Sequence, residues 1–134
     1  MMKKLTTSAL MLAASSLMSV GALAGTPSVS ESGQFEQKTG EELYSSICQG
    51  CHMEDGKGVH TGAGFYPALA NNPKLSSAGY PIYVLTNGFG GMPSFKSYLS
   101  DEQIVEVVNY VRTHFGNDYS EKVTIEEVKA VTKR

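Results

Sequence analysis

Two cysteines three residues apart, followed at once by a histidine, constrain this chain more than any other feature. The segment reads Cys48-Gln49-Gly50-Cys51-His52, and the chain contains two cysteines in all. This spacing is typical of covalent attachment of haem c, in which each thiol bonds one vinyl group of the porphyrin. Positions i and i+3 of a helix share one face, so Cys48 and Cys51 can both reach one porphyrin edge. His52 is then the expected first axial ligand of the iron.

Three other interpretations of this segment remain open. A zinc site needs further ligands, for which His60 and His114 are the candidates. A thioredoxin-like redox pair needs a preceding strand, whereas the residues before Cys48 recur with a helical period. A disulfide-stapled structural domain is the third. Haem attachment is favoured because the motif uses both cysteines and an export signal precedes it.

The export signal occupies residues 1–24. Two lysines follow the initial methionines, an uncharged apolar run comes next, and the segment ends Ala22-Leu23-Ala24. This pattern predicts a signal peptide cleaved after Ala24, and therefore a periplasmic protein with no stable membrane insertion after cleavage. An uncleaved anchor is the alternative, but serine and threonine interrupt the apolar run.

Composition narrows the functional class. Nine of the 11 basic residues and all 13 acidic residues lie after residue 24, which gives a net charge of −4. Such a balance excludes a nucleic-acid-binding protein that neutralises phosphates. Hydrophobic residues at 41% favour a globular domain over a disordered chain. We divide the chain into a signal peptide (1–24), an N-terminal arm (25–38), a main domain (39–119) and a C-terminal extension (120–134).

Helix signals dominate the main domain. Capping boxes open helices at Thr39 and at Ser100, and a third opens a short helix at Thr124. A further short helix is expected at Pro81–Thr86, with Ile82, Tyr83 and Leu85 able to cover a haem. Residues 53–79 are rich in glycine and proline without periodicity, so loops that wrap a large cofactor are expected there. The fold class is all-α.

Met92 is the candidate second axial ligand. It lies in the loop Gly88-Phe89-Gly90-Gly91-Met92-Pro93-Ser94-Phe95, whereas Met53 adjoins His52 and cannot reach the opposite haem face. A thioether ligand raises the reduction potential, which suits an electron carrier. Core packing is the alternative role for an isolated methionine. His60 and His114 are expected on the surface. One or more tyrosine hydroxyls could reach a haem propionate, and the sequence does not select among Tyr44, Tyr66, Tyr80, Tyr83, Tyr98, Tyr110 and Tyr119.

Over residues 39–119 these motifs resemble the small monohaem class I cytochromes c. The resemblance implies a cytochrome c fold, with three to five helices and long loops wrapped around one covalently attached haem c and its iron. It also implies that Gly40 and Tyr44 lie where the first helix crosses the last one, against Val107 and Tyr110.

The same resemblance assigns two further site residues. It implies that the Pro67 carbonyl accepts the ring N–H of His52 and so orients it, and that Leu69 packs against the haem. The Gly88 to Phe95 loop, with Tyr110-Val111-Arg112 and Phe115-Gly116-Asn117, is similar to cytochrome subunits of bacterial periplasmic dehydrogenases.

The expected function is one-electron transfer in the periplasm, by a haem c iron that cycles between Fe(III) and Fe(II) with His52 and Met92 as ligands. The chain itself is then not an enzyme. Its expected partners are redox proteins, namely a periplasmic dehydrogenase and a terminal oxidase or other acceptor. The alternative is a permanent electron-accepting cytochrome subunit of a periplasmic dehydrogenase complex. A haem sensor, in which Met92 yields to a gas ligand, is a third hypothesis.

Overall fold

The computed structural model describes residues 29–31, 33–62 and 64–134. The expected signal peptide, residues 1–24, and the first part of the expected arm lie outside the described residues. Within the described residues, no helix is both long enough and apolar enough to cross a membrane.

The first helical stretch is continuous from Gly40 to His52 and carries the cysteine motif at its end. It comprises α1 (Gly40–Leu43), a π-helical turn (Tyr44–Cys48) and α2 (Gln49–His52). The predicted capping box is confirmed, because the Thr39 side chain accepts from the Glu42 N–H and the Glu42 carboxylate accepts from the Thr39 N–H. Such π-helical turns are frequent at functional sites, and this one includes Cys48.

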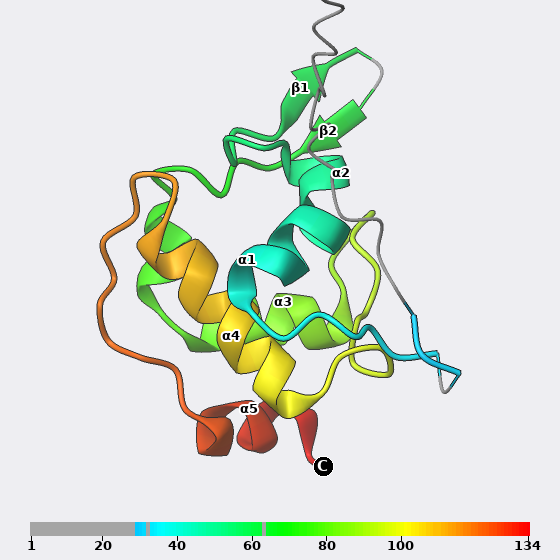
Figure 1. The fold of residues 1–134 in the computed structure, drawn as a ribbon. Coiled ribbons are helices and arrows are strands. Elements are labelled where there is room, and N and C mark those ends of the chain that lie inside the picture. Colours follow the sequence, from blue (N-terminus) through cyan, green and yellow to red (C-terminus); the bar gives the residue numbers. More distant parts are fainter. Residues whose placement is uncertain (1–28, 32, 63) are drawn as a thin grey trace, which may run out of the picture.

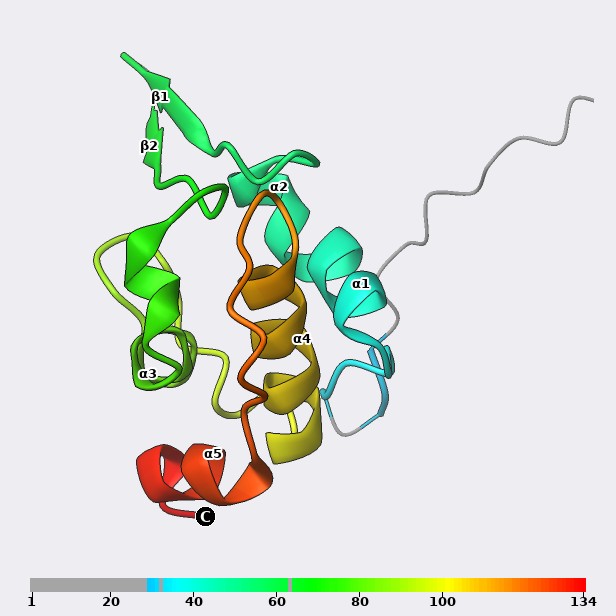
Figure 2. The same cartoon turned by 90° about the vertical axis from the view of Figure 1, so that its left-hand side faces the viewer.

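Helix α4 (Asp101–Thr113) packs across α1, as the two views of the fold show (Figures 1 and 2). The crossing is close at Gly40, where a Cβ atom would lie 2.3 Å from the Glu106 carbonyl oxygen and 2.5 Å from Tyr110 Cβ. Only glycine permits this approach. The resemblance therefore pointed correctly to Gly40 and Tyr110, while Glu106 supplies the nearest atom.

Helices α3 (Gly79–Asn87) and α5 (Ile125–Thr132) complete the helical body. Helix α5 packs against α3 and α4, and its Val128 is fully buried between them. Arg134 then fixes the chain end, because its guanidinium lies 2.7 Å from the Asp101 carboxylate. The apolar face of α5 is thus covered by this chain itself. The main core consists of Leu43, Ile82, Leu85, Leu99, Ile104, Val107, Val108, Val123 and Val128.

Three short elements lie in the segment for which the sequence predicts only loops. Strands β1 (Val59–Thr61) and β2 (Gly64–Tyr66) pair antiparallel, with Val59 opposite Tyr66, and a 3-10 helix, η2, spans Pro73–Ser76. The hairpin projects beyond α2 in both views (Figures 1 and 2). Strands of three residues are too short to carry a recognisable alternation, so no pattern in the sequence indicates them.

The described part of the N-terminal arm lies against the body. Val29 and Phe35 form an isolated antiparallel bridge, and Phe35 packs against the main core. The Gln103 side-chain amide donates to the Phe35 carbonyl at 2.7 Å and to the Gln37 carbonyl at 2.8 Å. The fold is therefore mostly helical with long loops, which confirms the predicted class, and the small sheet is an addition to it.

Candidate haem-binding site

His52 ends α2 and is 7% exposed. Its Nδ1 lies 2.9 Å from the Pro67 carbonyl oxygen. A carbonyl can only accept, so Nδ1 carries the proton and donates. In the neutral ring this arrangement leaves the Nε2 lone pair available to bind a metal.

Gly58 holds the Pro67 carbonyl in reach of His52. The Gly58 N–H donates to the His52 carbonyl at 3.0 Å, and its φ of +66° lies in the left-handed region. A Cβ atom here would lie 2.1 Å from the Tyr66 carbonyl oxygen and 2.8 Å from Pro67. Sequence reasoning did not single out Gly58, because one glycine in a glycine-rich loop carries no distinguishing signal.

The two cysteines are free thiols near the same helix end. Cys48 lines the cavity described below, and Cys51 is exposed at its outer part. Burial, with a smaller contribution from Cys51, raises the pKa of the Cys48 thiol to about 12. A redox-active cysteine needs a lowered thiol pKa, which the burial of Cys48 opposes. Among the described residues, no three His, Cys, Asp or Glu side chains converge as a metal site would require.

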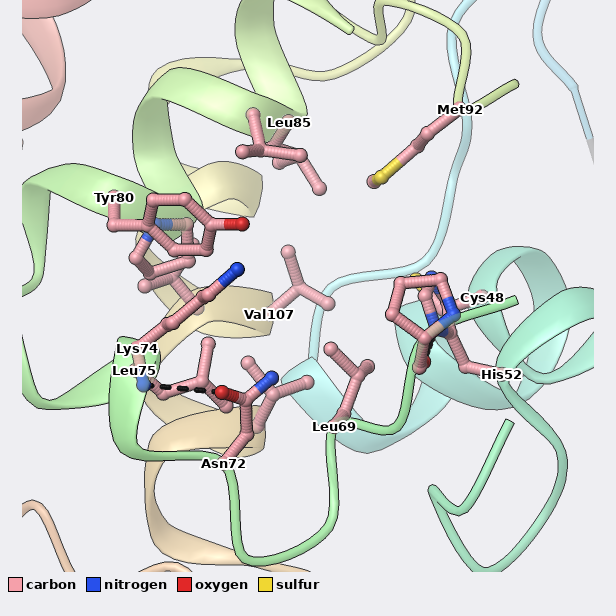
Figure 3. Close-up of a pocket in the computed structure, with 15 residues that line it drawn as sticks. Cys48, His52, Leu69, Asn72, Lys74, Leu75, Tyr80, Leu85, Met92 and Val107 are labelled. Carbon is pink, nitrogen blue, oxygen red and sulfur yellow. Dashed lines mark hydrogen bonds between the residues drawn. The ribbon is translucent and has the colours of Figure 1, made fainter. Parts of the chain in front are cut away.

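Met92 projects from the loop between α3 and α4. Phe89 and Met92 exchange two backbone hydrogen bonds of 3.0 Å, which close a tight turn. The Met92 side chain is half-buried, and its sulfur points into the cavity from a different side than His52 (Figure 3). This side chain packs against the main core.

One apolar cavity joins these side chains. Its inner part has a volume of about 160 Å³ and its outer part about 360 Å³, and both parts are lined by Cys48, His52, Pro67 and Met92. Thiols at one edge, an imidazole and a thioether from different sides, and apolar walls between them fit an iron porphyrin. Seven aliphatic side chains line the inner part, and Figure 3 labels four of them, Leu69, Leu75, Leu85 and Val107; the others are Val84, Val108 and Val111.

The helix that covers the cavity is rotated relative to the expectation. Leu85 of α3 lines the cavity as predicted, but Ile82 is buried in the main core and Tyr83 is 55% exposed. Pro81 and Val84 take their place, because positions i, i+3 and i+4 share one helix face. The prediction for Ile82 and Tyr83 was wrong because the short segment did not fix the phase of the helix.

Tyr44 anchors the end of the helical stretch that carries the two cysteines. Its hydroxyl donates to the Met53 carbonyl at 2.6 Å, and burial raises the pKa of Tyr44 above its ordinary value, with smaller contributions from neighbouring groups such as Cys48. The ring packs on Tyr110 and Phe115, with centroids 5.7 and 4.7 Å away. Tyr44 therefore holds the end of α2 against α4 and its following loop.

Asn117 organises the loop that carries Leu69. Its side-chain amide donates to the Leu69 carbonyl at 2.8 Å, and its oxygen accepts from the Asn72 N–H at 2.9 Å. No local pattern indicates this role of Asn117, because the partners lie 45 or more positions away along the chain. By contrast, His60 and His114 are exposed, as predicted.

Comparison with known proteins gives consistent matches. Residues 35–111 match the family model described as cytochrome c oxidase, cbb3-type, subunit III. The alcohol dehydrogenase (quinone) cytochrome c subunit of Gluconobacter oxydans (strain 621H) is 32% identical over 103 residues, which cover 67% of this chain and 21% of that protein. The fructose dehydrogenase cytochrome subunit of Gluconobacter japonicus is 33% identical over 107 residues, or 69% of this chain and 21% of that protein.

A smaller relative matches along most of its length. Cytochrome c-552 of Thermus thermophilus is 31% identical over 113 residues, which cover 69% of this chain and 83% of that protein. The chain thus spans about a fifth of the length of the two dehydrogenase subunits, but most of the length of this small cytochrome.

Proposed function

Because this chain belongs to the cytochrome c family, we propose that it carries single electrons in the periplasm through a haem c attached to Cys48 and Cys51, with His52 and Met92 as axial ligands. The family membership makes it an electron-transfer protein with covalently bound haem c, and not itself an enzyme. When bound, haem c supplies one-electron chemistry, because its iron alternates between Fe(III) and Fe(II).

One observation carries the proposal: Cys48, His52 and Met92 line the same apolar cavity. The thiols of Cys48 and Cys51 form the two thioether bonds and so fix one edge of the porphyrin. The Pro67 carbonyl accepts a hydrogen bond from the Nδ1–H of His52 and would so orient Nε2 toward the iron. Leu69 packs against the porphyrin face, and the thioether of Met92 favours the reduced iron.

This assignment is tested on the whole exported chain, expressed with haem c maturation. We expect a haem that stays bound after denaturation and leaves the chain in a Cys48→Ser, Cys51→Ser double variant. A wild-type chain that is exported without colour would contradict the assignment. Slow or absent carbon monoxide binding by the reduced protein would support Met92 ligation over a gas-sensing role.

The proposed electron donor is a periplasmic dehydrogenase, and the acceptor is a terminal oxidase or another redox protein. Several relatives are named as cytochrome subunits of alcohol, fructose or gluconate dehydrogenases, which supports the donor. The signal-peptide pattern of residues 1–24 supports the periplasmic location.

A permanent subunit of a dehydrogenase complex is the second candidate, and the names of these relatives favour it. The buried face of α5 argues against α5 as a tether, because Val128 and Thr132 already pack inside this chain. Gel filtration of a periplasmic extract from the native host, followed at the haem absorption band, separates the two. Elution at the size of one small domain supports a free carrier, whereas elution with a much larger protein supports a subunit.

A further inference from the structure

The apolar cavity has one charged end. Of the described residues that line its inner and outer parts, Lys74 is the only Lys, Arg, Asp or Glu. Its Nζ lies 5.7 Å from the centroid of the Tyr80 ring. In Figure 3 the Lys74 amine and the Tyr80 hydroxyl point into the cavity at the end away from Cys48 and His52.

A haem attached to Cys48 and Cys51 would place its propionate groups at this end of the cavity. Thioether bonds to Cys48 and Cys51 use the two vinyl groups, and the opposite edge of the porphyrin carries two propionate groups. A carboxylate next to an apolar cavity is costly unless a cation or hydroxyl pairs with it. Lys74 and Tyr80 are both exposed at the cavity margin, so they can meet a carboxylate without burial of their own charge or hydroxyl.

The turn that presents Lys74 is held in place by hydrogen bonds. The Asn72 side chain accepts from the Lys74 N–H at 3.0 Å and so caps η2. Arg112, which is 1% exposed, donates through Nε to the Leu75 carbonyl at 3.0 Å and through Nη2 to the Ser76 carbonyl at 3.3 Å.

Arg112 also joins this turn to the segment before α5. Its Nη1 donates to the Glu121 carbonyl, so the guanidinium binds backbone oxygens of two separate segments. No carboxylate lies within ion-pair distance of it among the described residues, so a buried positive charge remains behind the turn that carries Lys74.

We propose that Lys74 and Tyr80 bind the haem propionates. This inference rests on the proposed attachment through Cys48 and Cys51, which fixes the orientation of the porphyrin. It selects Tyr80 among the seven tyrosines of the chain, because Tyr66 and Tyr80 both line the cavity and Tyr80 is the one that lies beside Lys74. Tyr83 lies on the same helix, but it does not line the cavity.

The charge of Lys74 should raise the reduction potential of the haem. A cation beside the propionates offsets their negative charge, which otherwise stabilises ferric iron. Removal of the Lys74 charge therefore lowers the reduction potential. The effect is moderate, because exposed ion pairs contribute little.

The test compares reduction potentials of the intact holoprotein. Lys74→Met is expected to lower the equilibrium constant for reduction about three- to tenfold, where tenfold corresponds to about 59 mV for one electron. Lys74→Arg keeps the charge and should recover at least half of the change. Lys38→Met is the matched control, because Lys38 is exposed and lines neither part of the cavity. This control should leave the potential unchanged.

The tyrosine is tested in the same way. Tyr80→Phe removes the hydroxyl alone and should lower the equilibrium constant for reduction about twofold, while Tyr83→Phe should not change it. Amine acetylation of the wild-type holoprotein, followed by mass spectrometry, should label Lys74 at least threefold more slowly than Lys38.

The outcomes separate this inference from the function on which it rests. A coloured Lys74→Met protein whose potential matches that of Lys38→Met, with Lys74 acetylated as fast as Lys38, would overturn the propionate site and leave the electron-carrier function intact. A chain without covalent haem overturns both. If Lys74→Met fails to fold, the Tyr80→Phe potential and the acetylation rates still decide the matter.

Discussion

The two sides of the cavity are built in different ways. On one side, His52 is buried at a helix end, and a 2.9 Å hydrogen bond to Pro67 fixes its ring. Gly58 packs against Pro67 so closely that no side chain fits between them. On the other side, Met92 is half-buried on a loop, and only its backbone is hydrogen-bonded, to Phe89.

This contrast suits the ligand chemistries that we propose for His52 and Met92. An imidazole binds a metal through one nitrogen in one direction, so its ring has to be oriented by a neighbouring group. A thioether on a flexible side chain adapts to its surroundings and needs mainly an apolar environment. The His52 side therefore depends on fixed geometry, and the Met92 side depends on the loop that delivers the sulfur.

We expect the largest effect on the haem spectrum and on the holoprotein yield from removal of His52, the proposed ligand whose ring is oriented by Pro67. His52→Ala leaves the iron without its proximal nitrogen, so the low-spin absorption spectrum should be lost and the yield of holoprotein should fall at least tenfold. Visible absorption of matched extracts measures both. His60→Ala is the control, because His60 is exposed and does not line the cavity. A normal spectrum in His52→Ala would remove His52 from the ligand set.

Removal of Met92, the proposed second ligand, should change the reduction potential but leave the covalent haem attachment intact. Met92→Ala keeps both thioether bonds, but it should lower the equilibrium constant for reduction by well over tenfold, which corresponds to more than about 59 mV. A redox titration of the holoprotein measures this. Met53→Leu is the control, and an unchanged potential in Met92→Ala would show that the methionine only packs against the core.

Substitution of Gly58, which holds the Pro67 segment beside His52, should lower the free energy of unfolding. Gly58→Ala places a methyl group 2.1 Å from the Tyr66 carbonyl oxygen at a φ of +66°, so the Pro67 segment must move. We expect a loss of roughly 2 to 4 kcal/mol in the free energy of unfolding, measured by denaturant titration. Gly62→Ala in the hairpin is the comparison, since a Cβ atom there meets nothing within 4 Å. Equal stability of the two variants would show that the Pro67 segment beside His52 is not held rigidly by Gly58.

We expect the smallest change in stability and in reduction potential from a substitution of Gly91, which precedes Met92. At Gly91 a Cβ atom meets nothing within 4 Å, so Gly91→Ala should change the free energy of unfolding by less than about 0.5 kcal/mol. The potential should also stay within error of wild type. A shift comparable to that of Met92→Ala would show that the loop holds the methionine as tightly as Pro67 holds His52.

The predictable parts of the molecule are those with local causes. The capping boxes at Thr39 and Ser100 open α1 and α4 as expected, because the donors and acceptors lie three residues apart. The Pro81–Thr86 segment was correctly expected to be helical, but its rotation was not, since the side that faces the cavity depends on what α4 and α5 cover.

The sequence by itself determined the cysteine and histidine motif, the helix starts and the loop that carries Met92, because each follows from residues close together in the chain. Only the tertiary structure decided that Gly58 supports Pro67, that Asn117 holds the Leu69 loop, and that Lys74 and Tyr80 share one end of the cavity. These contacts join separate segments, and most arise because the chain packs around one cavity. No local pattern of side chains encodes such contacts, since each partner is free to be almost anywhere in the sequence.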